Sequence, residues 1–352
     1  MTVLSIELRS DTFTRPTPAM REAMYRAEVG DDVWNEDPTV HRLEERAAQL
    51  MGKERAMFVS SGTQGNLIGL LTHTRRGDEV VVGDQSHIFH YEVAGPSVVG
   101  GLQIRTLPNM GGHLDPQAVQ DAIRETDVHM PRTGCVALEN THNRCGGAVL
   151  RRGDMRAVAQ VARDHGIPVH LDGARVWNAA VALDVPMAEL VKDVDSVTFC
   201  LSKGLGAPVG SLLCGPADYI EEAHRYRKML GGGMRQVGIL AAAGLVALND
   251  NVDRLVDDHA NARRLAEGMA QMPGINIDPT TVESNIVIAD VSEMEMERDQ
   301  FILELLQRGV RIADFGGNLV RAVTSYEVNE TDIDHALKAM YEVTQDTALA
   351  YV

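Results

Sequence analysis

Lysine is scarce in this chain of 352 residues. Of its 33 basic residues only five are lysines, at positions Lys53, Lys192, Lys203, Lys228 and Lys338. A buried basic position that has no special need for an amine would be expected to carry another residue. A lysine inside a motif is therefore informative here.

Cysteine is rare as well, and basic residues are outnumbered by acidic ones. The four cysteines (Cys135, Cys145, Cys200 and Cys214) show no C-x-x-C spacing, and two lie in apolar strand-like runs. This favours buried free thiols in a reducing compartment over disulfides. The net charge of −17 argues against a nucleic-acid partner, because phosphate binding needs a basic surface.

Long apolar runs are missing. The apolar stretch Ile239–Leu248 has ten residues and is too short to cross a bilayer. Residues 1–10 have neither the basic start nor the apolar core of a secretory signal. We therefore expect a cytoplasmic protein that has no membrane segment.

Strand-like and helical patterns alternate through the first two-thirds of the chain. Predicted strands cover residues 56–59, 79–83, 135–138, 167–171, 197–202 and 211–214, with helical segments between most of them. This order predicts an α/β fold with a mostly parallel central sheet flanked by helices. We expect a large domain over residues 31–250, a small C-terminal α+β domain over 251–352, and an N-terminal segment, 1–30, that packs with the small domain.

Lys203 ends an apolar run and opens the glycine-rich stretch Gly204–Gly210. Asp172 ends another strand pattern, Val169-His-Leu-Asp172-Gly-Ala-Arg175, 31 residues earlier. An amine that forms a Schiff base and an acid that keeps a pyridine nitrogen protonated are the two groups a pyridoxal phosphate (PLP) enzyme must supply. Asp172 could also simply cap the following helix. Arg175 could hold the cofactor's phenolic oxygen or a substrate carboxylate, or make a surface ion pair.

Two small-residue loops bear on the ligand. Ser61-Gly62-Thr63-Gln64 lies between a strand and a helix, where backbone amides suit a phosphate, although an ordinary turn has the same composition. Gly204–Gly210 resembles the dinucleotide fingerprint, but its third glycine comes one residue late and Pro208 interrupts the expected helix. A dehydrogenase is therefore disfavoured, and the small residues suggest room for a bulky ring.

Histidines and arginines supply the remaining candidates. His87 follows a strand and could stack on a cofactor ring or be an ordinary loop residue. His87 and His90 have a spacing that permits a metal pair, but no third ligand stands out, and no metal is predicted. Arg321 lies in an apolar strand, where a buried guanidinium needs an anion such as a substrate carboxylate.

A basic cluster surrounds the glycines at 231–233. It consists of Arg225, Arg227, Lys228 and Arg235. Such a segment in an acidic protein could hold a phosphate from a neighbouring subunit, or it could be a solvated loop.

Taken together, these motifs resemble the low-specificity L-threonine aldolases, PLP enzymes with the aspartate-aminotransferase-like fold. The resemblance runs over essentially the whole chain. The segments that carry it are 8–12, 29–33, 62–64, 138–143, 172–175, 201–206, 208–211, 227–229, 231–236 and 239–244. One position departs from the family, because a tyrosine is common where Trp34 stands, and this leaves the shape of the substrate entrance open.

The resemblance implies a role for each candidate residue. Lys203 would hold PLP as a Schiff base and Asp172 would pair with its pyridine nitrogen. Gly62 and Thr63 would bind the phosphate, with Arg235 reaching it from a partner subunit, so that dimers with shared active sites build a homotetramer. His87 would stack on the ring, and His129 would lie close to the substrate hydroxyl. Ser10, Arg175 and Arg321 would hold the carboxylate of an amino-acid substrate.

The predicted reaction is the cleavage of L-threonine, L-allo-threonine or a related β-hydroxy-α-amino acid to glycine and an aldehyde. We expect His87, directly or through a water shared with His129, to position the transfer of the β-hydroxyl proton. Two alternatives remain open. The chain could be a PLP-dependent β-eliminating lyase or aminotransferase acting on small amino acids, or a catalytically silent protein of the same fold that serves as a binding module.

Overall fold

The computed structural model describes residues 5–349, which form two compact units. The larger unit comprises residues 15–145 and 149–252, and the smaller one 5–14, 146–148 and 253–349. Within residues 5–349, no helix has both the length and the apolar character that a membrane span requires. The four cysteines are free thiols, and three of them are buried.

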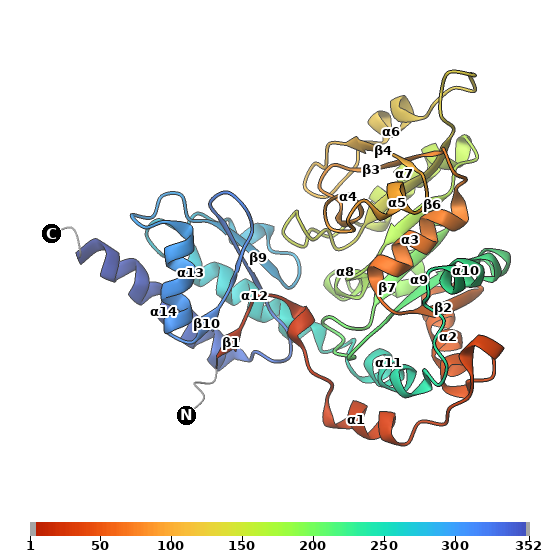
Figure 1. Ribbon diagram of the computed structural model, residues 1–352. Coiled ribbons are helices and arrows are strands. Elements are labelled where there is room, and N and C mark those ends of the chain that lie inside the picture. Colours follow the sequence, from red (N-terminus) through yellow and green to blue (C-terminus); the bar gives the residue numbers. More distant parts are fainter. Residues whose placement is uncertain (1–4, 350–352) are drawn as a thin grey trace. The chain divides into compact units, whose positions relative to one another are not determined.

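A seven-stranded sheet forms the centre of the larger unit (Figure 1). Its order is β2 (Arg55–Val59), β8 (Ser211–Gly215), β7 (Ser196–Cys200), β6 (Val169–Asp172), β5 (Thr133–Glu139), β3 (Glu79–Gly83) and β4 (Gln103–Leu107). Strand β8 runs opposite to the other six strands, which are parallel to one another. The predicted α/β fold with a mostly parallel sheet is confirmed, although the sequence analysis missed β4.

Eleven helices connect these strands or extend from them. They are α1 (Pro18–Tyr25), α2 (Pro38–Met51), α3 (Gly62–His73), α4 (His87–His90), α5 (Gly95–Val98), α6 (Pro116–Ala122), α7 (Arg152–Asp164), α8 (Val176–Leu183), α9 (Met187–Leu190), α10 (Ala217–Met229) and α11 (Gly238–Asp250). Asp37 caps α2 by accepting hydrogen bonds from the amides of Thr39 and Val40, and Gly52 ends it with φ +62°.

The alternation of side chains along the strands distributes the helices over both faces. Met57 and Leu213 pack with Ile68 of α3 and Ile220 of α10 in one buried cluster. Phe58, between two residues of that cluster, points to the opposite face. Helix α2 packs against β2, and its Glu44 accepts a hydrogen bond from the backbone amide of Phe58. Helices therefore cover this sheet on both sides, as the sequence predicted.

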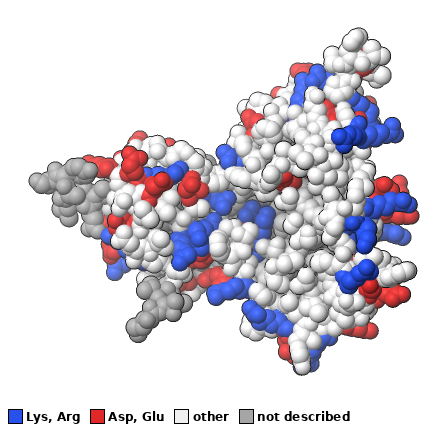
Figure 2. Space-filling view, in the orientation of Figure 1, with Lys and Arg blue, Asp and Glu red and all other residues white. Residues whose placement is uncertain are grey.

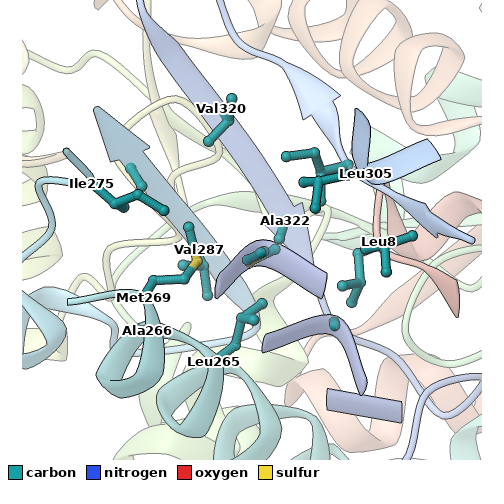
Figure 3. Packing of buried hydrophobic residues seen from close by; sticks show 14 of the residues in the cluster. Leu8, Leu265, Ala266, Met269, Ile275, Val287, Leu305, Val320 and Ala322 are labelled. Carbon is teal, nitrogen blue, oxygen red and sulfur yellow. The ribbon is translucent and has the colours of Figure 1, made fainter. Parts of the chain in front are cut away.

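The smaller unit is built on the antiparallel sheet β11 (Ala313–Asp314), β12 (Leu319–Val323) and β9 (Ile286–Asp290). A short parallel pair, β1 (Ile6–Glu7) and β10 (Val310–Arg311), lies in the same unit with the helices α12 (Leu255–Met269), α13 (Arg298–Gln307) and α14 (Glu330–Leu349). Figure 3 shows Met269, Val287 and Ala322 pointing toward one another in its core. This arrangement is the expected α+β unit.

The boundaries between the units differ from the expected ones. Helix α1 packs on α11, so residues 15–30 belong to the larger unit and not to the smaller one. Residues 146–148 lie in the smaller unit, where the Ser284 hydroxyl donates to the carbonyl of Gly147 at 2.7 Å. A proline-rich turn does not reveal on which core the next helix packs, so the sequence alone does not separate residues 15–30 from residues 1–14.

Candidate active site

Loops that follow four strands of the large sheet meet at one edge. Strands β3, β5, β6 and β7 are parallel, so their carboxyl ends lie together. His87 follows β3, Asp172 ends β6, and Lys203 comes three residues after β7. Strand β2 has the same direction, because β8 is antiparallel to both β2 and β7. The start of α3 therefore belongs to this edge too.

Asp172 is buried and held by two hydrogen bonds. Its Oδ1 accepts from the amide of Ala174 at 3.0 Å, and its Oδ2 accepts from Nδ2 of Asn66 on α3 at 2.8 Å. The first bond makes a tight turn after β6, which is the capping role considered from the sequence. The second bond ties the carboxylate to a residue that the sequence analysis did not identify.

His87 is positioned by two further buried acids. Its amide donates to Oε2 of Glu139 at 2.6 Å, and its Nδ1 lies 3.0 Å from Oε1 of Glu92. Burial lowers the pKa of His87, but the hydrogen bond to Glu92 and the charges of Asp172 and Glu92 outweigh it and leave the pKa raised. Burial also raises the pKa of Glu92, and the hydrogen bond with His87 offsets this only in part.

Lys203 is close enough to act on the same imidazole, because its charge lowers the pKa of His87. Its carbonyl accepts from the amide of Gly206, which has φ +81°. A Cβ at Gly210, where φ is +106°, would lie 2.4 Å from the ring of Phe58. These two glycines therefore serve the turn and its packing. The expectation that they make room for a bulky ring has no such direct support.

The start of α3 is a capped helix N-terminus beside the Lys203 loop. Ser61 Oγ accepts from the amide of Gln64 at 3.1 Å, and a Cβ on Gly62 would lie 2.9 Å from Sγ of Cys200 at the end of β7. The close approach explains the glycine. With Thr63 at the second helical position, the site offers backbone amides and a hydroxyl to an anion.

Glu92, Asp172 and His87 also lie at a spacing that a metal ion could bridge. His87, Glu92 and Asp172 each offer one ligand atom, and these atoms lie within 4.8 Å of one another. Asn66 bridges the two carboxylates with its amide nitrogen, at 2.8 Å from each, which accounts for their proximity. The His87–His90 pair considered from the sequence does not form, because His90 Nε2 bonds to the carbonyl of Asp84.

His129 lies elsewhere in the larger unit. It precedes β5, whose seven residues span about 20 Å at roughly 3.3 Å per residue, so it is at the edge opposite to Asp172. Its side chain is 84% exposed, and Nδ1 lies 2.9 Å from Asp127. Within one protomer His129 therefore lies away from Asp172, and its predicted place beside the substrate hydroxyl stays a prediction that needs a neighbouring copy. Its position before a strand, and not after one, was the available signal.

The basic cluster is not a single loop. Arg225, Arg227 and Lys228 lie on α10, and Arg227 is buried against Asp32 at 2.9 Å and the carbonyl of Phe58 at 2.8 Å. Arg235, with a 55% exposed side chain, pairs with Asp31 at 3.0 Å. Arg227 is thus a structural ion pair, and Arg235 is the more accessible of the two cations.

The candidates for a substrate carboxylate divide between the units. Arg175 is buried just after Asp172 in the larger unit. Ser10 and Arg321 lie together in the smaller unit, where Arg321 Nη2 donates to the carbonyl of Arg9 at 3.2 Å. The guanidinium of Arg321 also stacks over Phe315, 5.1 Å from the ring centre. Trp34, in a short 3-10 helix of the larger unit, is 74% exposed.

Comparisons with known proteins agree on one group. Residues 7–292 match the family described as beta-eliminating lyase. The chain is 45% identical over 347 residues to low-specificity L-threonine aldolase 1 of Arabidopsis thaliana, covering 97% of each chain. It is 47% identical over 289 residues to the low specificity L-threonine aldolase of Escherichia coli K12, covering 82% of this chain and 85% of that one.

The fold has solved relatives as well. The structure of a threonine aldolase from Leishmania major superposes with a TM-score of 0.82 at 18% identity, covering 96% of this chain and 99% of the other. At that identity the likeness concerns the fold.

Proposed function

This chain belongs to the beta-eliminating lyase family and, within it, to the low-specificity L-threonine aldolases. We propose that it cleaves L-threonine, L-allo-threonine and related β-hydroxy-α-amino acids to glycine and an aldehyde, with pyridoxal 5'-phosphate as cofactor. The observation that carries the proposal is the meeting of Lys203, Asp172 and His87 at one sheet edge.

The residues at this edge fit the cofactor. Asp172 is a buried carboxylate without a basic side chain among its two hydrogen-bond donors, and a protonated pyridine nitrogen would balance its charge. Lys203 would hold the cofactor through its ε-amino nitrogen, and the amides of Gly62 and Thr63 would bind its phosphate. When bound, PLP supplies the electron sink for the pair left at the α-carbon.

We assign to His87 the role of the base that accepts the proton of the substrate's β-hydroxyl. A base must hold that proton as the Cα–Cβ bond breaks. Since Nδ1 of His87 faces Glu92, Nε2 is the nitrogen that can face a substrate. Glu139 fixes the backbone of His87, so both acids orient the imidazole without touching the substrate. A role for His129 at this hydroxyl would require the loop of a neighbouring copy.

Three residues are proposed to bind the substrate carboxylate. Arg175, Arg321 and Ser10 offer guanidinium groups and a hydroxyl, and planar guanidinium matches a carboxylate in a bidentate way. Binding of the carboxylate fixes the rotation about the bond from the α-carbon to the amino nitrogen of the substrate. That rotation decides which bond to the α-carbon breaks, and Trp34 would shape the entrance on the side of the β-substituent.

We further propose that the protein works in the cytoplasm as a homotetramer of dimers with shared active sites. In this arrangement Arg235 would exchange Asp31 for the phosphate in a partner subunit. The accessible ion pair supports the idea, because a surface pair is weak and easily replaced. Large apolar side chains at the surface of the larger unit, such as Trp34, Met229 and Val93, would be covered by the partner.

The experiment that tests the proposal combines colour and products. The purified protein should show the visible absorption of bound PLP and should release acetaldehyde and glycine from L-threonine. Pyruvate and ammonia formed from L-serine, with threonine left intact, would identify a β-eliminating lyase instead. A colourless protein that leaves both amino acids intact would favour a binding module.

A further inference from the structure

A line of buried polar side chains runs from Asp172 into the interior of the larger unit. Asn66 Nδ2 lies 2.8 Å from Asp172, and Asn66 Oδ1 lies 3.2 Å from Nε2 of His170. His170 Nδ1 lies 2.9 Å from Oγ of Ser196, which in turn lies 2.7 Å from Nε2 of His73. Neither histidine has a role in the reaction proposed above.

The two carboxylates fix the orientation of the Asn66 amide. Nδ2 is 2.8 Å from Oδ2 of Asp172 and 2.8 Å from Oε1 of Glu92. A carbonyl oxygen in that place would face two other acceptors, so the NH₂ group must point to the acids. The amide oxygen then faces His170, whose Nε2 must carry a proton to donate to it.

The rest of the line follows from this first bond. His170 is fully buried and burial lowers its pKa to about 3, so the ring is neutral and Nδ1 is an acceptor. Ser196 must donate its only proton to that nitrogen, and its oxygen can then accept from Nε2 of His73. Burial lowers the pKa of His73 to about 4, which leaves this ring neutral as well. Every donor points toward Asp172.

The fold provides a close fit for this line. A Cβ at Gly69 of α3 would lie 2.5 Å from Cε1 of His170, so only glycine lets the helix pass over the ring. Tyr219 stacks on His73 with ring centres 4.4 Å apart, and its hydroxyl donates to the carbonyl of Gly69 at 3.0 Å. Both histidine rings are therefore closely packed by their surroundings.

We propose that Asn66, His170, Ser196 and His73 are positioning residues, forming a hydrogen-bond chain that holds Asp172 ionised and oriented toward the pyridine nitrogen of PLP. Bonds in such a chain polarise one another in the same direction and favour negative charge at its end. The proposal rests on the cofactor assigned above. The hydrogen-bond chain lies behind Asp172 and would adjust how strongly the bound cofactor withdraws electrons.

One serine hydroxyl and one threonine hydroxyl on β7 offer a matched test. Ser196 belongs to the chain, whereas Thr198 has a buried hydroxyl without a hydrogen-bond partner and lies on the same strand. Ser196→Ala should raise the Kd for PLP, measured by adding the cofactor to the apoprotein, about 10-fold, as loss of one buried hydrogen bond predicts. The visible band of the bound cofactor should also change its dependence on pH. Thr198→Val should leave both unchanged.

Equal Kd values and spectra for the two variants would overturn the proposal. If Ser196→Ala does not fold, the pair His170→Gln and His170→Met replaces it. Glutamine keeps an N–H that can reach Asn66, and methionine has similar length and no donor. We expect near-native PLP affinity for the first and a loss of about 10-fold for the second. Equal affinities would contradict the chain.

Tautomers test the chain apart from any cofactor. Nitrogen-15 NMR of histidine-labelled apoprotein should show neutral His170 and His73, both protonated at Nε2. A proton on Nδ1 of His170 would overturn the assigned direction even if the protein binds PLP. Failure of the wild-type protein to bind PLP would instead overturn the proposed function and leave the tautomer result intact.

Discussion

A buried acid in direct contact with the candidate base contributes to its charge. Glu92 follows His87 by five residues and meets its Nδ1 at 3.0 Å. Two carboxylates and one ammonium group act on the imidazole, and the balance favours the protonated form. The pH at which His87 can accept a proton therefore depends on its neighbours more than on its burial.

Replacing Glu92 with glutamine should lower the pKa of His87. The neutral amide no longer stabilises the imidazolium, and loss of one nearby opposite charge shifts a pKa by about 1 unit. Since the base must be deprotonated, the acidic limb of the profile of kcat/KM against pH should move to lower pH. Glu189→Gln, which removes an exposed charge from an ion pair with Arg152, should leave the limb in place. An unmoved limb in Glu92→Gln would contradict the role of Glu92.

Sequence patterns pointed to the candidate residues at the sheet edge, but not to the side chains that support them. Lys203, Asp172 and His87 stand directly after strand-like runs, where a local pattern is informative. Asn66 lies inside a helix, and Glu92 lies in an irregular segment just before Val93 and Ala94, which both have positive φ. Their hydrogen bonds to Asp172 and His87 depend on how α3 packs on the sheet, and no local spacing encodes that.

At the scale of elements, glycines determine how closely α3 approaches the sheet. A Cβ on Gly65 would lie 2.5 Å from Cγ2 of Thr198 on β7. Gly62 and Gly69 face Cys200 and His170 in the same way. One face of this helix therefore sits against β6 and β7 at a distance that side chains would not allow.

Gly65→Ala should destabilise the protein despite the better helix propensity of alanine. The propensity gain is at most about 1 kcal/mol, whereas overpacking at such a contact costs about 1–3 kcal/mol. Urea unfolding followed by circular dichroism would measure the difference. Gly153→Ala on α7 is the control, because a Cβ there meets nothing within 4 Å, and it should be neutral or slightly stabilising. A Gly65→Ala variant as stable as the control would contradict this account of the packing.

Elements with strong apolar patterns were predicted within a few residues, and the others were not. Strand β3 was predicted with its observed bounds, because Val80, Val81 and Val82 are all buried. Strand β4 has the sequence Gln103-Ile-Arg-Thr-Leu107 and none of its residues is buried, so it lacks that signal. Helix α10 carries many charges, and the three glycines that follow it at 231–233 led the sequence analysis to treat the basic cluster as a flexible segment, either a phosphate site or a solvated loop.

At the scale of the whole molecule, buried neutral histidines make stability depend on pH. Burial is the main cause that lowers the pKa of His170 to about 3 and those of His73, His224 and His259 to about 4. The unfolded chain takes up protons near the usual pKa of 6.5, before the folded protein does. Stability is therefore full above that pH and falls as the pH drops through this range.

The melting temperature should decrease as the pH is lowered from neutral to about 4.5. Buried acids act in the opposite direction, because burial raises the pKa of Glu44 to about 7 and that of Asp258 to about 6. Burial also raises the pKa values of Asp32 and Glu92. Their carboxyls become easier to keep buried as they gain protons. All four histidines have pKa values at least about 2 units below the usual one, whereas only Glu44 and Asp258 among the acids have shifts of that size, so we expect a net loss. A Tm that stays constant or rises below pH 6 would contradict this balance.

Shared active sites predict complementation between two defective variants. Lys203→Ala should be inactive, and Arg235→Ala should bind PLP weakly if its guanidinium reaches a partner's phosphate. Co-expression of the two should form mixed oligomers in which some sites have both residues intact, so threonine cleavage should reappear. Each variant expressed alone is the control. Mixed oligomers with no activity beyond that of the parents would show that Arg235 acts within its own chain or not at all.

Figure 2 shows acidic and basic side chains interspersed over the visible face of the larger unit, without one dominant basic field there. The surface charge of this face therefore does not indicate the substrate. The proposed reaction is best tested by mutation of Lys203. Lys192, an exposed lysine that pairs with Glu189, provides the matched control.

The most direct test is to incubate L-threonine with the wild-type protein, Lys203→Ala and Lys192→Ala, and to quantify the products. The wild-type protein and Lys192→Ala should each form one glycine for every acetaldehyde, and at similar rates. Lys203→Ala should lose the visible absorption and at least about 1,000-fold in rate, as removal of a covalent catalytic group predicts. Threonine cleavage that persists in Lys203→Ala, or wild-type protein that yields no glycine, would contradict the account.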